Sequence, residues 1–341
     1  MDIHTDVPLK DRTTMRLGGN ARFFVEVQTI DELRGVHEQS LEQKLPIYIL
    51  GGGSNTVAHD DGFNGIVIHP QFFGFDVIAT DTESTTIRVG ASENWDATVK
   101  RTVDMNLTGI EAMSAVPGTV GAAPVQNIGA YGQDVSEVIT SVDVYDTESH
   151  DAIVLTPEDC KFSYRNSTFR SDSAGRYIIT SVTMRLGKYA PTPPFYKPVT
   201  KYLAEQHITS YTPQDIRDAV MAIRFAKLPD PTKKPNSGSF FKNAIIEDWL
   251  FAELMNKYPN MPSYNMPSKM HKIPTGWLIE QCGFKGQLLH GIRIHDRNCL
   301  VLINESASSY ADLEAAQNEI ITAVRDRFRI TIEREPLLLA S

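Results

Sequence analysis

The sequence lacks any long hydrophobic run, and this absence excludes the simplest kind of membrane protein. None of its 341 residues lies in an apolar stretch of about 18 residues, the length at which a transmembrane helix is expected. The N-terminal residues MDIHTDVPLKDRTT have no basic region followed by an apolar one, so we expect no secretory signal peptide. Both absences predict a cytoplasmic protein with no membrane partner.

Cysteine and positive charge are also scarce. Cys160, Cys282 and Cys299 are widely spaced and form neither a disulfide framework nor a zinc pattern, and the last two have apolar neighbours typical of a core. His290 and His295 belong to no carboxylate-histidine pattern, so no metal site is expected. The 33 Lys and Arg residues against 42 Asp and Glu residues give a net charge of −9, which argues against nucleic-acid binding.

Helical and strand patterns alternate unevenly along the chain. Helical spacing of apolar residues occurs in segments 30–44, 93–106, 212–228, 275–282 and 309–328, with Thr29 and Thr212 as expected N-caps. Strand patterns occur in ARFFVEVQT, LPIYIL, GIVIHP, TTIRVG, VITSVDVYD, YIITSVTMRL, CLVLIN and RITIE. The proline-rich GKYAPTPPFYKP predicts a linker or an ordered loop, and we place the main boundary within residues 188–230. This irregular alternation predicts an α+β fold.

Two passages of small residues lie in the N-terminal half. GGGSN, residues 51–55, follows a short apolar strand, and glycine N–H groups at such a point can form a nest for phosphate. It is no dinucleotide-binding fingerprint, because Thr56 stands where a third glycine is needed and no helical pattern follows. A tight exit from the strand is the alternative interpretation.

The second passage, PGTVGAAPVQNIGAYG at residues 117–132, contains four glycines, three alanines and one bulky tip, Tyr131. Such small side chains fill little space by themselves. A ligand lying against the backbone, such as a flat ring system with a pyrophosphate tail, explains the passage better than a simple connector does. Two phosphate-compatible loops in one half of the chain therefore favour a nucleotide cofactor.

The stretch NSGSFFKN at residues 236–243 places Ser239 between a glycine and two phenylalanines. A hydroxyl beside apolar walls can deliver a proton where water is restricted. A serine beside a glycine is also a common turn residue, and the octapeptide alone favours the turn.

The motifs GGGSN, GASENW, PGTVGAAPVQNIGAYG, YRNSTF and NSGSFFKN occur in this order. Together they resemble UDP-N-acetylenolpyruvoylglucosamine reductase (MurB) of type I, over nearly the whole chain from TTMRLGG to IEREP. That family is UDP-N-acetylmuramate dehydrogenase, a flavoprotein of peptidoglycan synthesis. The resemblance implies a role in cell-wall biogenesis, cell shape and cell division, and we expect a monomer.

The resemblance implies a FAD-binding domain of the vanillyl-alcohol-oxidase (PCMH) type in two α+β lobes, followed by a C-terminal α+β substrate-binding domain. We assign residues 1–72 and 73–190 to the two lobes, 191–227 to the type I loop and a connecting helix, and 228–341 to the C-terminal domain. FAD is the implied cofactor and NADPH the implied co-substrate. The residues implied to contact FAD are Gly51, Gly52, Gly53, Ser54, Asn55, Pro117, Gly118, Val120, Gly121, Asn127, Gly129 and Tyr131.

The implied reaction passes a hydride from NADPH through the N5 atom of FAD to the enolpyruvyl double bond of UDP-N-acetylenolpyruvoylglucosamine. Ser239 matches the family's proton donor, and this match reverses the turn interpretation. Arg165 would bind the substrate carboxylate and the developing enolate through its planar fork of donors. Glu335 matches the catalytic glutamate, and Glu333 stays an alternative because Arg334 stands where the family often has proline.

Six other positions match substrate-binding residues of the family: Tyr164, Tyr196, Lys227, Asn243, Lys285 and Asn298. The two lysines would meet the UDP diphosphate, although a solvated surface charge is the commoner role of lysine. Two other functions stay open, namely a FAD-linked oxidase of the same fold and a non-catalytic nucleotide-binding module. NSGSFFKN and Lys227 favour the reductase, because an oxidase needs no proton donor for an enolate.

Overall fold

The computed structural model describes residues 2–340, and the chain divides into two compact units. Unit 1 comprises Met1–Val7, Ala21–Gly52 and Asn64–Ala226, and unit 2 comprises Pro8–Asn20, Gly53–Phe63 and Lys227–Ser341. The sequence-based division places residues 8–20 and 53–63 in the first lobe, whereas here they group with the C-terminal part of the chain. The reason is core packing, because Met15, Leu17 and Val57 lie in one apolar cluster with Phe240 and Phe241.

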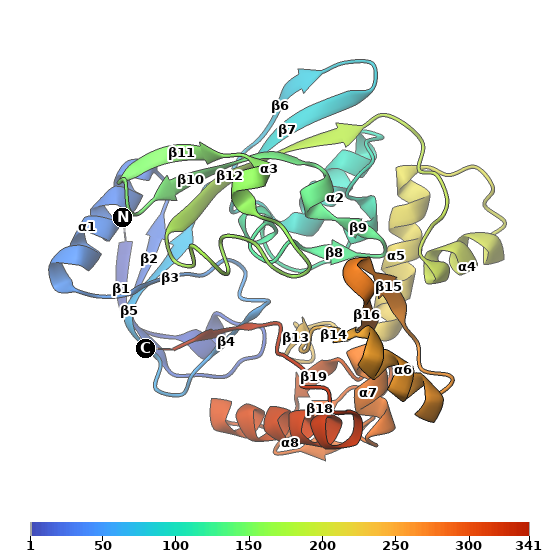
Figure 1. The fold of residues 1–341 in the computed structure, drawn as a ribbon. Helices are drawn as coiled ribbons and strands as arrows, with labels where there is room; N and C mark the ends of the chain where they lie inside the picture. The colour runs from blue at the N-terminus through green and yellow to red at the C-terminus, as the bar shows by residue number, and fades with distance from the viewer. Residues whose placement is uncertain (1, 341) are drawn as a thin grey trace. The chain divides into compact units, whose positions relative to one another are not determined.

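Unit 1 is built on two larger sheets and a short ribbon (Figure 1). The first sheet runs β1 (Asp2–Pro8), β2 (Asn20–Val27), β5 (Phe63–Pro70) and β3 (Ile47–Ile49). The second runs β11 (Asp151–Leu155), β10 (Ile139–Asp146), β12 (Tyr177–Gly187), β7 (Ser84–Gly90) and β6 (Phe75–Thr80). The ribbon pairs β8 (Gly129–Ala130) with β9 (Gln133–Asp134). The helices are α1 (Ile30–Gln43), α2 (Trp95–Asp104), α3 (Pro157–Cys160), α4 (Lys197–Glu205) and α5 (Pro213–Lys227).

The local sequence explains the first two helices of unit 1. Thr29 caps α1 by accepting the N–H of Glu32 at 3.2 Å, as the sequence predicts. In α2, Trp95, Val99 and Val103 are buried and pack in one cluster with apolar residues of β7, β10 and β12. The predicted apolar face of α2 is therefore confirmed.

The proline-rich passage forms a loop only as far as Tyr196, because α4 begins at Lys197. This short helix, which the sequence analysis missed, carries proline in its first turn, where the missing N–H costs no helical hydrogen bond. Val199 and Leu203 of α4 pack with Ile216 and Val220 of α5. The loop is thus anchored at its C-terminal end by a small helical core.

Unit 2 contains smaller sheets and three further helices among the described residues. One sheet runs β13 (Asn236–Ser239), β19 (Val301–Asn304), β18 (Ile292–Ile294) and β17 (Leu288–Leu289). Another runs β14 (Ala244–Glu247), β16 (Met270–Ile273) and β15 (Tyr264–Met266), and β20 (Leu337–Leu339) pairs in parallel with β4 (Thr56–Ala58). The helices are α6 (Asp248–Lys257), α7 (Thr275–Gln281) and α8 (Tyr310–Phe328). Mostly antiparallel sheets with segregated helices confirm the α+β class.

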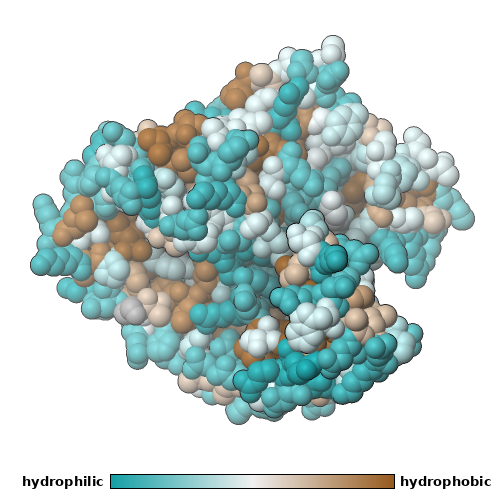
Figure 2. Space-filling model, viewed as in Figure 1, coloured by the Kyte–Doolittle hydropathy of each residue, from teal (hydrophilic) through white to brown (hydrophobic). Residues whose placement is uncertain are grey.

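Helix α8 illustrates how the separate segments of unit 2 join. Ser309 and Asp312 form a capping box at its start. Asp60 also accepts the N–H groups of Tyr310 and Ala311 at 2.6 and 3.0 Å, so a residue of segment 53–63 completes the cap. Figure 2 shows a mainly hydrophilic outer side for this helix. Within residues 2–340, no helix has both the length and the apolarity needed to cross a membrane.

The prediction of a strand at RITIE is wrong. Helix α8 ends at Phe328 with Arg329 as a left-handed C-cap, and the residues that follow bury Ile330 and Ile332, so the alternation in the sequence reports real burial. The only ladder contact of this segment among the described residues is an isolated bridge between Arg334 and Phe241. A strand needs a neighbour that offers a full ladder, and no local pattern specifies that neighbour.

Candidate functional site

The structure brings the two passages of small residues together in unit 1. A Cβ atom added to Gly51 would lie 2.9 Å from Thr119 Oγ1, and one added to Gly52 would lie 3.4 Å from Gly118 Cα. Gly52 therefore lies against the backbone of the second passage, and Gly51 lies against the Thr119 side chain, so a side chain at either position would crowd the other loop. The result is a cradle of main-chain atoms, which fits the pyrophosphate of a nucleotide cofactor.

The motif GASENW, residues 90–95, holds the second passage in place. Val120 and Gly121 donate their N–H groups to Glu93 O and Ala91 O at 2.9 and 2.8 Å. A Cβ on Gly121 would lie 2.6 Å from Ala91 Cβ, so glycine is required by close packing. Because these two N–H groups are already engaged and the Val120 side chain is fully buried, both residues fix the course of the loop. Pro117, at the start of the passage, is exposed.

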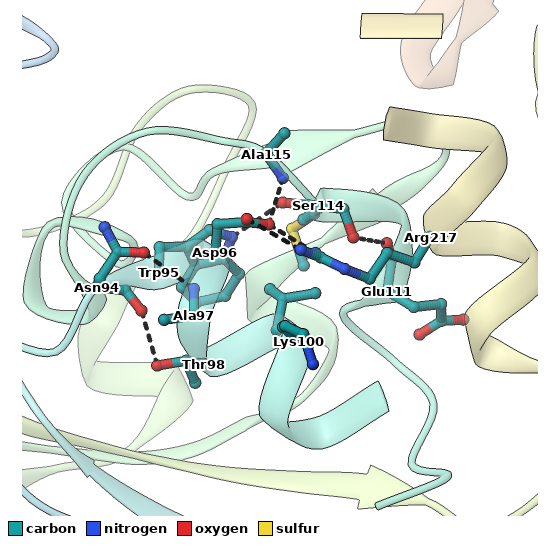
Figure 3. A network of polar contacts seen from close by, with 12 residues as sticks. Asn94, Trp95, Asp96, Ala97, Thr98, Lys100, Glu111, Ser114, Ala115 and Arg217 are labelled. Carbon is teal, nitrogen blue, oxygen red and sulfur yellow. Dashed lines mark hydrogen bonds and ion pairs between the residues drawn. The ribbon is translucent and has the colours of Figure 1, made fainter. Parts of the chain in front are cut away.

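Asp96 of α2 forms a polar network beside this loop that the sequence analysis missed (Figure 3). Its carboxylate accepts two hydrogen bonds from Arg217 of α5, at 2.6 and 3.0 Å, and one from the Ala115 N–H at 2.6 Å. Burial would raise the pKa of Asp96, but the hydrogen bonds from Arg217 and Ala115 outweigh it and hold the pKa below its ordinary value. The partners are 121 positions apart, so no local pattern marks them.

Arg165 and Asn127 lie together in unit 1. Arg165 donates hydrogen bonds to the carbonyl oxygens of Asn127, at 3.1 Å, and Gly129, and its side chain is 17% exposed. Asn127 is buried, and its backbone lies in the left-handed region with φ of 45°. Its side-chain oxygen accepts the N–H of Ser136 at 3.1 Å. The Tyr164 ring lies 5.2 Å from the Arg165 guanidinium. Arg165 is therefore a held, largely buried group, and its Nη1 also forms an ion pair with the half-exposed Asp134 at 3.7 Å.

Tyr131 and Tyr196 line one cavity of about 310 Å³ in unit 1. Their rings are 5.8 Å apart in an edge-to-face arrangement. Burial raises the pKa of Tyr131, and the hydrogen bond and the charge of Arg224 oppose this shift. Gln133 and Glu111, which also line the cavity, are hydrogen-bonded to each other at 3.0 Å. The cavity brings the tip of the glycine-rich passage together with the proline-rich loop.

In unit 2, Ser239 ends β13 and pairs with Val301 of β19. The next residues, Phe240 and Phe241, are fully buried in the core of the unit. Glu335 donates its N–H to Phe240 O at 2.8 Å, so the segment carrying Glu335 runs beside the residue that follows Ser239. The sequence left both Glu333 and Glu335 as candidates for the catalytic glutamate. This contact places the backbone of Glu335 beside the residue after Ser239.

Glu333 occupies a different environment. Its side chain is 73% exposed and pairs with Lys242 at 3.2 Å. Its carbonyl oxygen accepts the Lys242 N–H at 2.9 Å. Glu333 is therefore paired with the largely buried Lys242, and the choice of Glu335 as the catalytic glutamate stays a prediction.

The second half of GGGSN also belongs to unit 2. Gly53 has φ of 63°, and an added Cβ would lie 2.1 Å from Arg12 O, so only glycine fits. Asn55 O accepts the N–H of Leu337 at 2.9 Å, and Ser54 lies between these two loop residues. Asn55 is therefore tied to β20, which follows Glu335, and Gly53 to the segment around Arg12.

Among the remaining predicted substrate residues, Asn243 and Asn298 both lie at the start of α7, because Asn243 contacts Thr275 and a Cβ on Gly276 would lie 3.7 Å from Asn298 Oδ1. Asn243 and Asn298 accept backbone N–H groups, from Thr275 and Leu300, through their side-chain oxygens, each at 3.1 Å. Lys285 pairs with Glu280 at 2.7 Å, and this hydrogen bond raises the pKa of Lys285. Lys227 is the exposed last residue of α5.

The cysteines have no reactive environment. Burial raises the pKa of Cys160 to about 12 and that of Cys299 to about 11, so neither thiol ionises near neutral pH. Cys282 packs partly against the core of unit 2, as its apolar neighbours predict, and burial raises its pKa too. Among residues 2–340, no three His, Cys, Asp or Glu side chains are grouped so as to hold a metal ion.

Two sequence families match separate parts of the chain. Residues 21–150 match the family described as FAD binding domain, and residues 230–339 match the family described as UDP-N-acetylenolpyruvoylglucosamine reductase, C-terminal domain. The solved structure of UDP-N-acetylenolpyruvylglucosamine reductase (MurB) from Thermus caldophilus matches the whole chain over its own full length, with a TM-score of 0.69 at 21% identity. This match and the two families confirm the expected FAD-binding and C-terminal architecture.

Curated relatives extend the match over the whole chain. A UDP-N-acetylenolpyruvoylglucosamine reductase of Burkholderia cenocepacia (strain HI2424) is 38% identical over 98% of this chain and 96% of its own length. The enzyme of the same name from Dechloromonas aromatica (strain RCB) is 37% identical over 99% of this chain and 100% of its own length. By this extent of identity, the chain belongs to the UDP-N-acetylenolpyruvoylglucosamine reductase family.

Proposed function

We propose that the protein reduces UDP-N-acetylenolpyruvoylglucosamine to UDP-N-acetylmuramate with FAD and NADPH, a step of peptidoglycan precursor synthesis. Family membership supports the substrate and the reaction. The observation that carries the proposal is the pairing in unit 2, where Glu335 donates its N–H to the carbonyl of the residue after Ser239. A proton donor and a carboxyl on neighbouring backbone segments suit the reduction of an enol ether.

The glycine cradle of unit 1 fits FAD. Gly51, Gly52 and Gly118 bring the two loops close together with no side chains of their own, which suits a pyrophosphate, while Val120 and Gly121 keep the loop in position. Bound FAD would supply hydride transfer from NADPH to the enolpyruvyl group. Asn127, Gly129 and Tyr131 would contact the cofactor, as would Gly53, Ser54, Asn55 and Pro117.

Arg165 would stabilise the charge that develops on the substrate. Addition of hydride to one carbon of the double bond moves an electron pair into an enolate conjugated with the carboxylate. A planar guanidinium serves two oxygens at once, and its hydrogen bonds to the carbonyls of Asn127 and Gly129 hold it in one orientation. Tyr164 would support it through the ring contact at 5.2 Å.

Ser239 would complete the reduction by giving its hydroxyl proton to the neighbouring carbon. A serine is a weak acid, so it serves only a strongly basic partner, and the enolate carbon is one. Glu335, in its protonated form, would hydrogen-bond to the substrate carboxyl. Lys227, Lys285, Asn243, Asn298 and Tyr196 would bind the nucleotide portion, with the lysines beside the diphosphate.

Anaerobic mixing of the purified yellow protein with NADPH tests the proposal. We expect NADPH to bleach the flavin absorbance and the enolpyruvyl substrate to restore it. Recovery with oxygen but not with that substrate would favour the oxidase alternative. Protein that stays colourless after incubation with FAD would instead favour a nucleotide-binding module. The monomeric state and the cytoplasmic location stay predictions.

A further inference from the structure

The strand that carries Ser239 contains one more residue than its partner. Asn236 pairs with Ile303 and Ser239 with Val301, so β13 advances by three positions while β19 advances by two. Gly238, inside this interval, has φ of 70°. An extra residue with a left-handed glycine is the signature of a β-bulge, a device that re-aims a side chain.

Local contacts keep the bulge in place. The side-chain oxygen of Asn236 accepts the N–H of Gly238 at 2.8 Å, and the ladder resumes when Phe240 donates its N–H to Leu300 O at 2.7 Å. An added Cβ on Gly238 would meet no heavy atom of the described residues within 4 Å. Conformation, and not space, therefore accounts for glycine at this position.

The bulge separates the two serines of NSGSFFKN. In a regular strand, residues two positions apart share a face, so Ser237 and Ser239 would lie together. With the extra residue, Ser239 instead shares its face with Asn236, the residue whose partner is Ile303. Ser237 is 6% exposed, and its hydroxyl has no hydrogen-bond partner among residues 2–340, whereas Ser239 is half-buried.

We propose that Gly238 is a positioning residue, whose left-handed bulge selects Ser239 over Ser237 as the hydroxyl that the reaction uses. The inference rests on the proposed function, because it concerns the proton donor of that reaction. Without the bulge, the ladder would slip by one position, and a one-residue slip turns a side chain to the opposite face. Gly238 acts on the chemistry through Ser239 and needs no contact with substrate.

Three substitutions at position 238 test the conformational requirement. Asparagine tolerates the left-handed region, alanine does so poorly, and a β-branched valine is worst. We expect reoxidation of the reduced flavin by the enolpyruvyl substrate to slow by about threefold or less in Gly238→Asn, about tenfold in Gly238→Ala and about a hundredfold in Gly238→Val. Flavin content and the rate of flavin reduction by NADPH should match the wild type in every variant.

Hydrogen exchange gives a readout independent of turnover. The Phe240 amide should stay protected in Gly238→Asn and exchange faster in Gly238→Ala, because its bond to Leu300 O depends on the register. If Gly238→Ala changes both flavin reoxidation and Phe240 exchange less than Gly238→Asn does, then the size of the side chain matters and not the backbone conformation. That result overturns the proposal. If Gly238→Val does not fold, the comparison of Gly238→Asn with Gly238→Ala still tests the proposal.

A wild-type protein that fails to reduce the substrate would overturn the proposed function. Exchange at Phe240 would still show in that case whether the bulge depends on a left-handed residue.

Discussion

The glycine cradle of unit 1 and the Ser239 strand of unit 2 are built in opposite ways. The cradle is a main-chain surface, where Gly51 and Gly52 lie against Gly118 and Thr119 with little room for side chains. The strand presents side chains from a ladder, with Phe240 and Phe241 buried in the core beside it. A cradle of this kind depends on the absence of Cβ atoms, whereas the strand depends on its register.

Substitutions should therefore disturb the two regions in different ways. An added methyl group should affect the cradle by occupying space that a ligand needs. A change on the strand should affect the reaction by moving or removing one functional group. Substitutions in both regions test this contrast, beginning with the one that should slow the reaction most.

Removal of the Ser239 hydroxyl should have the largest effect. We expect Ser239→Ala to slow substrate reduction by roughly 10²–10⁴-fold, the range for loss of general acid catalysis, with flavin reduction by NADPH unchanged. Rapid-mixing measurements of the two half-reactions check this. Ser237→Ala is the matched control and should keep both rates, because its buried hydroxyl has no partner within residues 2–340. Equal loss of both half-reactions in Ser239→Ala would argue against a proton donor.

The two glutamates of IEREP should differ in the same assay. Glu335→Ala should lower substrate reduction by about tenfold to a hundredfold, because it removes the hydrogen bond to the charged substrate carboxylate. Glu333→Ala should stay within about twofold, because its carboxylate is 73% exposed and its pair with Lys242 contributes little. A larger loss in Glu333→Ala would reverse the assignment.

Asp96 should matter for stability and not for chemistry. Asp96→Asn should lower the free energy of unfolding by about 2 kcal/mol, because the largely buried Arg217 loses its charged partner. Urea unfolding measures this. Asp104→Asn, which removes an exposed pair with Lys100, should change it by less than about 1 kcal/mol.

The effect of Asp96 should also depend on pH. The folded-state pKa of Asp96 lies below its ordinary value of 3.8, so its stabilisation is fully present above that pH and is lost as the pH falls through the folded-state pKa. The difference between Asp96→Asn and the wild type should therefore shrink in acid. A constant difference down to the lowest pH at which the protein folds would contradict this.

Gly52→Ala should have the smallest effect, confined to the cofactor. Its Cβ would lie 3.4 Å from Gly118 Cα, a tight but tolerable contact, so the apoprotein should keep its stability while FAD affinity falls roughly tenfold. Titration of the apoprotein with FAD measures the affinity. Gly35→Ala, at an exposed helical position with open space around it, should keep that affinity. Equal FAD affinities in the wild type, Gly52→Ala and Gly35→Ala would contradict a main-chain cradle.

Elements with strong local signals were predictable from the sequence. Thr29 caps α1 through the N–H of Glu32, three residues away. The helical spacing of Trp95, Val99 and Val103 marks the buried face of α2, although the strands that cover it lie far along the chain. The extended segment after α8 was predicted as a strand and buries the expected residues, but it has no full partner strand. Local patterns report burial and capping, and they do not report which distant segment completes a sheet.

The residues of the candidate site also fall into those with a local sequence signal and those without one. The glycines of both passages became candidates through their own composition, whereas Ser239 became one through the family resemblance, because its octapeptide alone favoured a turn. Asp96 was missed because its partner Arg217 lies in another helix, and the buried hydrogen bonds of Arg165 to main-chain carbonyls were equally invisible. An ion pair between distant helices leaves no spacing rule in the chain.

The amino-acid order alone specifies the small residues of two loops, the caps and apolar faces of the helices, and the order of motifs that marks the family. Long-range packing was needed to show that Gly51 and Gly52 meet Gly118 and Thr119, that segments 8–20 and 53–63 belong to unit 2, and that Gly238 breaks the register before Ser239. Propensity and capping act within one turn or one strand, whereas close approach and register are set by whichever distant backbone fills the remaining space.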